Sequence, residues 1–186
     1  MLLRFFISLI CLCCISVSSF SEEAILDLRQ NDWSEGQIHS LQGNWDFYWQ
    51  QFIEPDEFQK LESNPIPFPV PGAWNSPPEG FQKFPGFGHA TYKITVLVPQ
   101  HITNLFLSIP DMASAYKLWN NNELISKNGT IATSKDLESP AYLPKFVELT
   151  ANNGKLELVL QTSNFHYKWG GVWYPLKLTD AEGFMN

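Results

Sequence analysis

The sequence predicts an all-β sandwich or jelly roll with one short helix. Short segments in which apolar and polar residues alternate recur along the chain, and Gly, Pro and Asn turn signals separate them. Eight or so such segments are typical of two packed antiparallel sheets. The part of the chain after an expected export leader is long enough for one domain with one core.

The expected leader is the segment 1–21. Arg4 precedes an apolar run from Phe5 to Val17, and small serines follow it. The run is too short to span a bilayer comfortably, so we expect cleavage near Ser21 and export to the periplasm or the extracellular space. This segment also contains every cysteine of the chain, Cys11, Cys13 and Cys14. The exported part would therefore have no thiol for a disulfide or a metal site.

The strand signals are alternation and aromatic or β-branched composition. In Leu41 to Trp49, the rings Trp45, Phe47 and Trp49 alternate with more polar neighbours. The other predicted strands are residues 90–98, 104–109, 113–119, 123–126, 145–149, 155–163 and 171–179. The clearest row of inward-facing residues is Leu156, Leu158 and Leu160.

Turn and proline signals connect these strands. Acidic residues after Pro55 flank Phe58 and Leu61 at a spacing that fits the one short helix. Four alternating prolines in residues 65–71 impose an extended path, and residues 71–88 form a long ordered loop. Asn residues at 120–122 favour a hairpin turn, and we interpret Asn128-Gly129-Thr130 as a turn and not as a glycosylation site.

The charge balance disfavours nucleic acid and anionic membrane surfaces as partners. The net charge is −7, and it becomes −8 when Arg4 leaves with the leader. Such a chain is a poor ligand for nucleic acid or for an anionic membrane surface. Because aromatic residues make up 15% of the chain and charged residues only 17%, the surface suits neutral polar ligands such as sugars.

Two sets of motifs carry a family resemblance. Leu41-x-Gly43-x-Trp45-x-Phe47, Val70-Pro71-Gly72-x-Trp74-Asn75 and Gly88-x-Ala90-Thr91-Tyr92 resemble, in this order, the N-terminal sugar-binding jelly roll of family 2 glycoside hydrolases such as β-galactosidase. The second set resembles the extracellular region of bacterial seven-transmembrane receptors with diverse intracellular signalling modules (7TM-DISM). It consists of Ile109-Pro110, Ser114-Ala115-Tyr116-Lys117-Leu118-Trp119, and Gln161-x-Ser163-Asn164-Phe165-x-x-x-x-Gly170-Gly171 with Pro175.

The resemblance extends from Leu41 to Leu178. It implies a galactose-binding-like β-sandwich over residues 41–180, after a lead-in at 22–40 and before a tail at 181–186. It also implies a sensory input domain whose partners would be a small-molecule or carbohydrate ligand and, if the chain is a fragment, the membrane helices of a receptor. Because function depends on sites and not on folds, the ligand itself does not follow from the resemblance.

Catalysis is not expected. Asp46, Asp111, Glu123, Glu148 and Glu157 are available, but nothing in the sequence pairs two of them as an acid and a nucleophile or base. The four histidines are dispersed, and no Gly-x-Ser-x-Gly motif is present. We expect no catalytic residues and no cofactor. A structural calcium ion held by loop carbonyls and an acid stays open.

Sugar recognition needs an aromatic ring for the C–H face of a pyranose and polar groups for its hydroxyls. Three loops combine these groups. We predict ligand binding by Trp74, Asn75, His89, Asn164, His166, Trp169 and Trp173. Trp45 and Trp119 are expected in the core, whereas both roles stay open for Trp169 and Trp173.

The sequence therefore favours an exported ligand-binding sensory domain. Two alternatives remain. The same aromatic surface could dock another protein or a second copy of the chain. The chain could also be an orphan non-catalytic domain of a family 2 glycosidase.

Overall fold

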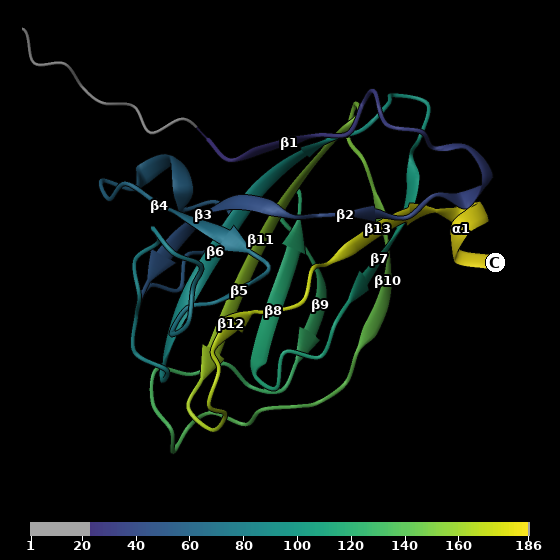
Figure 1. Ribbon diagram of the computed structural model, residues 1–186. Coiled ribbons are helices and arrows are strands. Elements are labelled where there is room, and N and C mark those ends of the chain that lie inside the picture. The colour runs from purple at the N-terminus through teal and green to yellow at the C-terminus, as the bar shows by residue number, and fades with distance from the viewer. Residues whose placement is uncertain (1–22, 186) are drawn as a thin grey trace, which may run out of the picture.

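The computed structural model describes residues 23–185 and confirms an all-β sandwich (Figure 1). A seven-stranded sheet has the order β4-β3-β6-β11-β8-β9, with β1 paired to β6, and a four-stranded sheet has the order β10-β7-β13-β2. The strand β5 pairs with β12 in a small third sheet. The strand bounds are β1 Ile25–Asp27, β2 His39–Ser40, β3 Gly43–Trp49, β4 Ile66–Val70, β5 Gly72–Ala73, β6 Gly88–Leu97, β7 Asn104–Ile109, β8 Ala115–Asn120, β9 Glu123–Asn128, β10 Lys145–Thr150, β11 Lys155–Asn164, β12 Gly171–Val172 and β13 Lys177–Asp180.

The core lies between the two large sheets and is built from alternating strand residues. Trp45 and Phe47 on β3 are fully buried, and so are the three leucines predicted to face inward on β11. On the facing sheet, β7 contributes Leu105, Leu107 and Ile109. Period-two alternation therefore identified the inward side of these strands correctly.

The proline-rich segment is an edge strand. The strand β4 pairs only with β3, and Pro67 and Pro69 alternate along it with the buried residues Phe68 and Val70. An edge strand tolerates prolines at alternate positions, because every second N–H points away from the neighbouring strand. The predicted extended path is thus confirmed, and it also forms part of the sheet.

The lead-in at 22–40 is integrated into the sandwich from Glu23 onward and is not a separate arm. Its first strand β1 pairs in parallel with β6, and β2 pairs with β13. Leu28 and Trp33 are buried in the core. The apolar residues of this segment thus complete the core.

The helical elements differ in place from the prediction. Where the short helix was expected, the chain forms a single 3-10 turn, η2 (Phe58–Lys60); another 3-10 turn, η1, spans Ser34–Gly36. The short α-helix α1 (Ala181–Met185) lies in the segment expected to be a tail. None of the helices in residues 23–185 is long and apolar enough to cross a membrane.

The predicted turns are confirmed, and the predicted last strand is not continuous. Asn121 and Asn122 adopt φ values of 47° and 71°, which closes the hairpin from β8 to β9. At the second predicted turn the chain bends at Gly129 (φ 67°), while Asn128 is the buried last residue of β9 and donates to the carbonyl of Ala141 (3.0 Å). Residues 171–179 form β12 and β13 with an irregular stretch between them. The expected leader 1–21 and its cysteines lie outside the described residues.

Candidate functional site

Two long loops meet at one end of the sandwich, the lower end in Figure 1. One joins β11 to β12 and runs into the residues after β12; we call residues 165–174 the aromatic loop. The other joins β9 to β10 and is called the Glu138 loop, residues 129–144. The predicted ligand residues His166, Trp169 and Trp173 belong to the aromatic loop.

Trp74 was predicted to contact a ligand, but it is a core residue whose ring is covered in this structure. Its side chain has no exposed surface, and its Nε1–H donates to the carbonyl of Gly86 (3.1 Å). Its backbone N–H donates to the carbonyl of Gly170 (2.9 Å). A Cβ at residue 170 would overlap the indole ring. The glycine thus permits close packing of the aromatic loop on the core.

The side-chain amide of Asn164, at the end of β11, bonds backbone groups of the aromatic loop and of the 71–88 loop. Its Nδ2 donates to the carbonyls of Gly86 (2.9 Å) and Tyr167 (2.8 Å), and its Oδ1 accepts the N–H of Tyr167 (3.0 Å). The side chain is fully buried. Asn164 therefore positions the loop, because its buried amide already bonds three backbone groups.

Asn75 joins the 71–88 loop to the aromatic loop. Its Nδ2 donates to the carbonyl of Lys168 (2.8 Å), and its Oδ1 accepts the N–H of Gly170 (3.2 Å). Both partners are backbone groups on either side of Trp169. Asn75 is thus a positioning residue that holds the chain around the predicted sugar platform.

A buried glutamate that the sequence did not single out anchors the same region. Oε1 of Glu138 accepts the hydroxyl of Ser163 (2.5 Å), and Oε2 accepts the N–H of Phe165 (2.7 Å) and lies 2.9 Å from Nδ1 of His166. The carboxylate is buried and the imidazole is partly exposed. Three donors around one carboxylate lock the Glu138 loop to the aromatic loop. An acid within a polar loop gives no signal in the sequence of such a role.

Four rings of the aromatic loop form a platform. Tyr167 stacks on Trp173 with 5.3 Å between ring centroids, and Trp169 and Tyr174 lie against Trp173 at 5.7 Å and 5.4 Å. The Trp169 side chain is 41% exposed, and Nζ of Lys168 lies 4.2 Å from its ring centroid. The Nε1–H of Trp173 is buried and has no acceptor among the described residues. The exposed ring surface of Trp169 thus lies next to a buried donor that has no protein partner among the described residues.

His89 does not join this cluster. Its ring packs on Phe52 with 4.6 Å between centroids. Burial lowers the pKa of His89 below its ordinary value, so the ring is neutral at pH 7. Of the seven predicted residues, His166, Trp169 and Trp173 thus share one surface. Asn75 and Asn164 support that surface, while Trp74 and His89 pack elsewhere.

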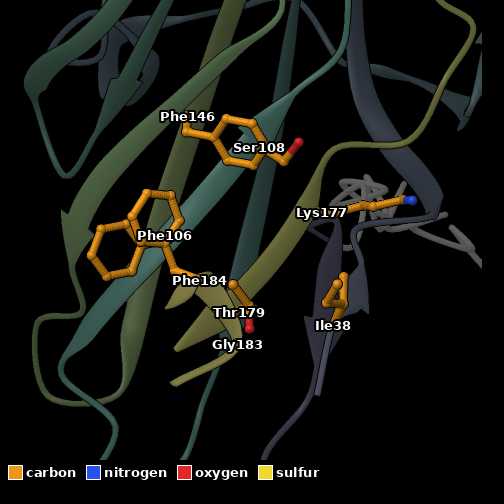
Figure 2. A pocket seen from close by; sticks show the side chains of 8 residues that line it. All are labelled: Ile38, Phe106, Ser108, Phe146, Lys177, Thr179, Gly183 and Phe184. Carbon is orange, nitrogen blue, oxygen red and sulfur yellow. The ribbon is translucent and has the colours of Figure 1, made fainter. Parts of the chain in front are cut away.

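A second candidate surface was not predicted from the sequence. The outer face of the four-stranded sheet carries a groove of about 460 Å³, which we call the apolar groove. Figure 2 shows its aromatic side chains on one side and Ile38 apart from them. The rings of Phe106 and Phe184 stack at 4.2 Å, while Phe146 and Ile38 are 65% and 60% exposed. The sequence does not reveal this groove, because Phe184 on α1 and Phe106 on β7 are far apart along the chain.

Comparison with solved structures supports the fold. The chain is similar to a GH2 β-galacturonidase from Eisenbergiella tayi (TM-score 0.55, 16% identity), covering 82% of this chain and 26% of that one. It is also similar to β-glucuronidases from Ruminococcus gnavus (0.56, 14%, 79% and 28%) and an uncultured Clostridium species (0.56, 19%, 80% and 30%). At these identities the likeness establishes the fold alone. The chain thus has the fold of a β domain found in GH2 glycoside hydrolases, and it spans less than a third of their length.

No protein-family model matches the sequence, and a comparison with curated proteins finds no match.

Proposed function

We propose that this chain is an exported input domain that binds a carbohydrate or a similar small polar ligand on the aromatic loop. The exposed indole of Trp169 carries the proposal, because it offers a flat apolar surface in a loop that hydrogen bonds already hold. The neighbouring groups complete the chemistry: the ammonium group of Lys168 and the imidazole of His166 can bond sugar hydroxyls.

The preformed shape of the loop supports binding. Asn75 bonds the backbone on both sides of Trp169, and Glu138 bonds the start of the loop. A ligand that meets an ordered loop does not have to order it, and this saves about 0.5–1.5 kcal/mol for each side chain already fixed. The binding surface is therefore available before the ligand arrives.

The sensory part of the proposal depends on the resemblance to receptor input domains. In a longer receptor, binding would shift the population of sandwich conformations and pass that shift to membrane helices. In Figure 1 the helix α1 lies away from the aromatic loop, so such a signal would run through the sheets. A ligand would first change the conformations that the Glu138 loop and the aromatic loop populate.

We also propose that the domain does not catalyse a reaction. Glu138 stands between Ser163 and His166, so the imidazole contacts the carboxylate and not the hydroxyl. A serine nucleophile is activated when an imidazole contacts its hydroxyl directly. The geometry therefore favours a structural role for this cluster.

A panel of neutral and acidic mono- and oligosaccharides, titrated against the purified chain, tests the binding proposal. Intrinsic tryptophan fluorescence and Tm are the two readouts. We expect at least one sugar to shift both, with the response lost in Trp169→Ala and kept in Phe146→Ala, which removes an exposed ring from the apolar groove. If no sugar shifts either readout, or if Trp169→Ala responds as the parent does, the proposal fails. Retention on a polysaccharide without turnover would favour the orphan glycosidase domain.

The apolar groove favours a second candidate function, which is self-association. Its exposed rings would be covered by the same groove of a second copy. Lys177 lines the groove and Glu182 lies on α1, two residues before Phe184, and neither forms an ion pair within residues 23–185. A two-fold arrangement can place Lys177 of each copy opposite Glu182 of the other.

Sedimentation equilibrium tests this second function. We expect concentration-dependent dimers that Phe146→Ala weakens and Trp169→Ala leaves unchanged. Trp169→Ala is thus the test variant in the sugar assay and the control in the association assay, and Phe146→Ala is the reverse. A monomer at all concentrations rules out self-association and leaves the sugar proposal untouched.

A further inference from the structure

A polar hollow lies at the seam between the two large sheets. The strand β9 ends the seven-stranded sheet and β10 ends the four-stranded sheet, and the two strands lie next to each other. The hollow has a volume of about 300 Å³ and is lined mainly by polar side chains, among them Asn120, Glu123, Glu148 and Asn152. Because β9 and β10 are edge strands, each also presents backbone carbonyls without a strand partner.

Asn120 lines this hollow, and its amide oxygen is an unpaired acceptor. The side chain is 95% buried, since its exposed fraction is 5%. Its Nδ2 donates to the carbonyl of Thr150 (3.0 Å), which fixes the orientation of the amide. Its Oδ1 is buried and accepts no hydrogen bond within the described part of the chain. Buried polar atoms are rarely left without a partner, so this oxygen calls for one.

The amide oxygen of the neighbouring Asn121, unlike that of Asn120, has a partner. Its Oδ1 accepts the N–H of Glu157 (3.0 Å), and its Nδ2 lies 3.4 Å from the carbonyl of Thr150. Asn121 therefore has its amide engaged within the protein. Of these two asparagines, Asn120 is the one whose amide oxygen has no partner within residues 23–185.

Two carboxylates flank the same hollow. Glu123 and Glu148 are exposed, and neither takes part in an ion pair within residues 23–185. The residues that line the hollow include no Lys, Arg or His. Glu123 and Glu148 thus line the hollow together with Asn120, whose amide oxygen is unpaired, and no cationic side chain of the described residues lines it. Hard cations bind this combination of oxygen donors.

We propose that the polar hollow binds a calcium ion through Oδ1 of Asn120 and the carboxylates of Glu123 and Glu148. Waters and edge-strand carbonyls would complete the six to eight oxygens that calcium takes. Calcium fits better than magnesium, because long glutamate side chains on two strands do not preset a strict octahedron. The ion would link β9 to β10 and so join the two sheets.

The donor set indicates a weak site. Within the described residues, no three Asp, Glu, His or Cys side chains come together as metal ligands, so the ion would depend on two carboxylates and an amide. Affinity for calcium rises with the number of charged ligands, and the dissociation constant we expect is on the order of 10⁻⁴–10⁻³ M. Such sites are typical of extracellular modules.

Thermal unfolding of the purified chain, stripped with EDTA and then titrated with CaCl₂ or MgCl₂, tests the site. At about tenfold excess of calcium over its dissociation constant we expect Tm to rise by roughly 3 °C or more, and magnesium to do less. Glu123→Gln and Glu148→Gln should each weaken calcium binding by roughly tenfold or more. Glu79→Gln, which changes an exposed acid in the 71–88 loop, is the matched control and should keep the full response.

The proposal is overturned if calcium leaves Tm unchanged, if magnesium acts equally well, or if both glutamine variants at the hollow respond as the parent does. Because both glutamates are exposed, their variants should fold, and the Tm without calcium verifies this. Sugar binding at the aromatic loop does not depend on this outcome, so the two proposals fail separately.

Discussion

The Nδ1 atom of His166 lies 2.9 Å from Oε2 of Glu138, a residue 28 positions earlier in the chain. The carboxylate is buried, whereas about a third of the imidazole side chain is exposed. Because Nδ1 contacts Glu138, Nε2 is the ring nitrogen left for a ligand. This contact joins the Glu138 loop to the surface on which we place the sugar.

Glu138→Gln should destabilise the domain. The carboxylate accepts from Ser163 and Phe165 as well as contacting His166, and an amide would turn one N–H group toward these donors. Leaving a buried donor without its acceptor costs about 1–3 kcal/mol. Urea unfolding measures the loss. The exposed Glu79→Gln variant should stay within about 0.5 kcal/mol of the parent.

A double-mutant cycle with His166→Ala isolates the contact between the two side chains. We expect a coupling free energy of roughly 0.5–3 kcal/mol between Glu138→Gln and His166→Ala. Purely additive losses would show that Glu138 acts through Ser163 and Phe165 alone.

Gly170→Ala should destabilise the domain through steric overlap. A methyl group at residue 170 would enter the space of the Trp74 ring, and overpacking of a core costs about 1–3 kcal/mol or more. Chemical denaturation gives this cost, and the loss should shrink when Trp74→Phe makes room. An equal loss in both backgrounds would contradict the packing explanation. Gly80→Ala is a useful comparison, because open space surrounds Gly80 and only its φ of +91° opposes a side chain.

The sequence was sufficient for the sheets but not for the site. Alternation located β3, β7 and β11, because one face of each strand packs on the opposite sheet. The helix was predicted in the wrong place. The acids that flank Phe58 and Leu61 have a spacing that fits a short helix, but the same spacing also fits the single 3-10 turn that forms there.

The candidate site was recognised only in part, because the same residue types serve packing and binding. Trp74 and Trp169 both stand beside polar residues in glycine-containing loops, yet only Trp169 is exposed. Which indole is buried depends on the pairing of β5 with β12, which brings Gly170 against Trp74. Glu138 was missed because its role also depends on tertiary contacts. The groups that bond its carboxylate lie 25 to 28 residues away in the sequence.

Asn75→Ala should loosen the aromatic loop without unfolding the sandwich. The change removes the bonds to the carbonyl of Lys168 and the N–H of Gly170, and we expect a loss of about 1–2 kcal/mol in the free energy of unfolding. Hydrogen exchange should speed up at the N–H of Gly170. Asn75→Asp keeps an acceptor for that N–H, so its exchange there should stay slower than in Asn75→Ala. Unchanged exchange in Asn75→Ala would contradict the positioning role.

Stability should fall as the pH drops from 6.5 to 5. Burial lowers the pKa of His39 and that of His89. Below the ordinary histidine pKa of about 6.5 the unfolded chain then binds more protons than the folded one, so the free energy of unfolding decreases with falling pH. The pH dependence that Asp46 contributes has the opposite sign. Burial raises the pKa of Asp46, so its contribution to the free energy of unfolding grows as the pH falls toward about 3.9.

Urea unfolding at a series of pH values checks this dependence. His39→Gln and His89→Gln should each flatten the decline between pH 6.5 and 5. Stability that stays constant or rises over that interval would contradict the lowered pKa of these two histidines.

Trp169→Ala and Trp173→Ala should distinguish an indole that contacts the ligand from one that stabilises the aromatic loop. Trp169 is 41% exposed, so its removal should cost stability by less than about 1 kcal/mol while abolishing the sugar response. Trp173 is partly buried and stacks on Tyr167, and losing that packing should cost roughly 1–3 kcal/mol. Titration and urea unfolding of the same preparations compare the two effects. Trp169→Phe keeps a flat ring and should retain part of the binding; if it binds no better than Trp169→Ala while folding normally, the indole acts through something other than stacking on the ligand.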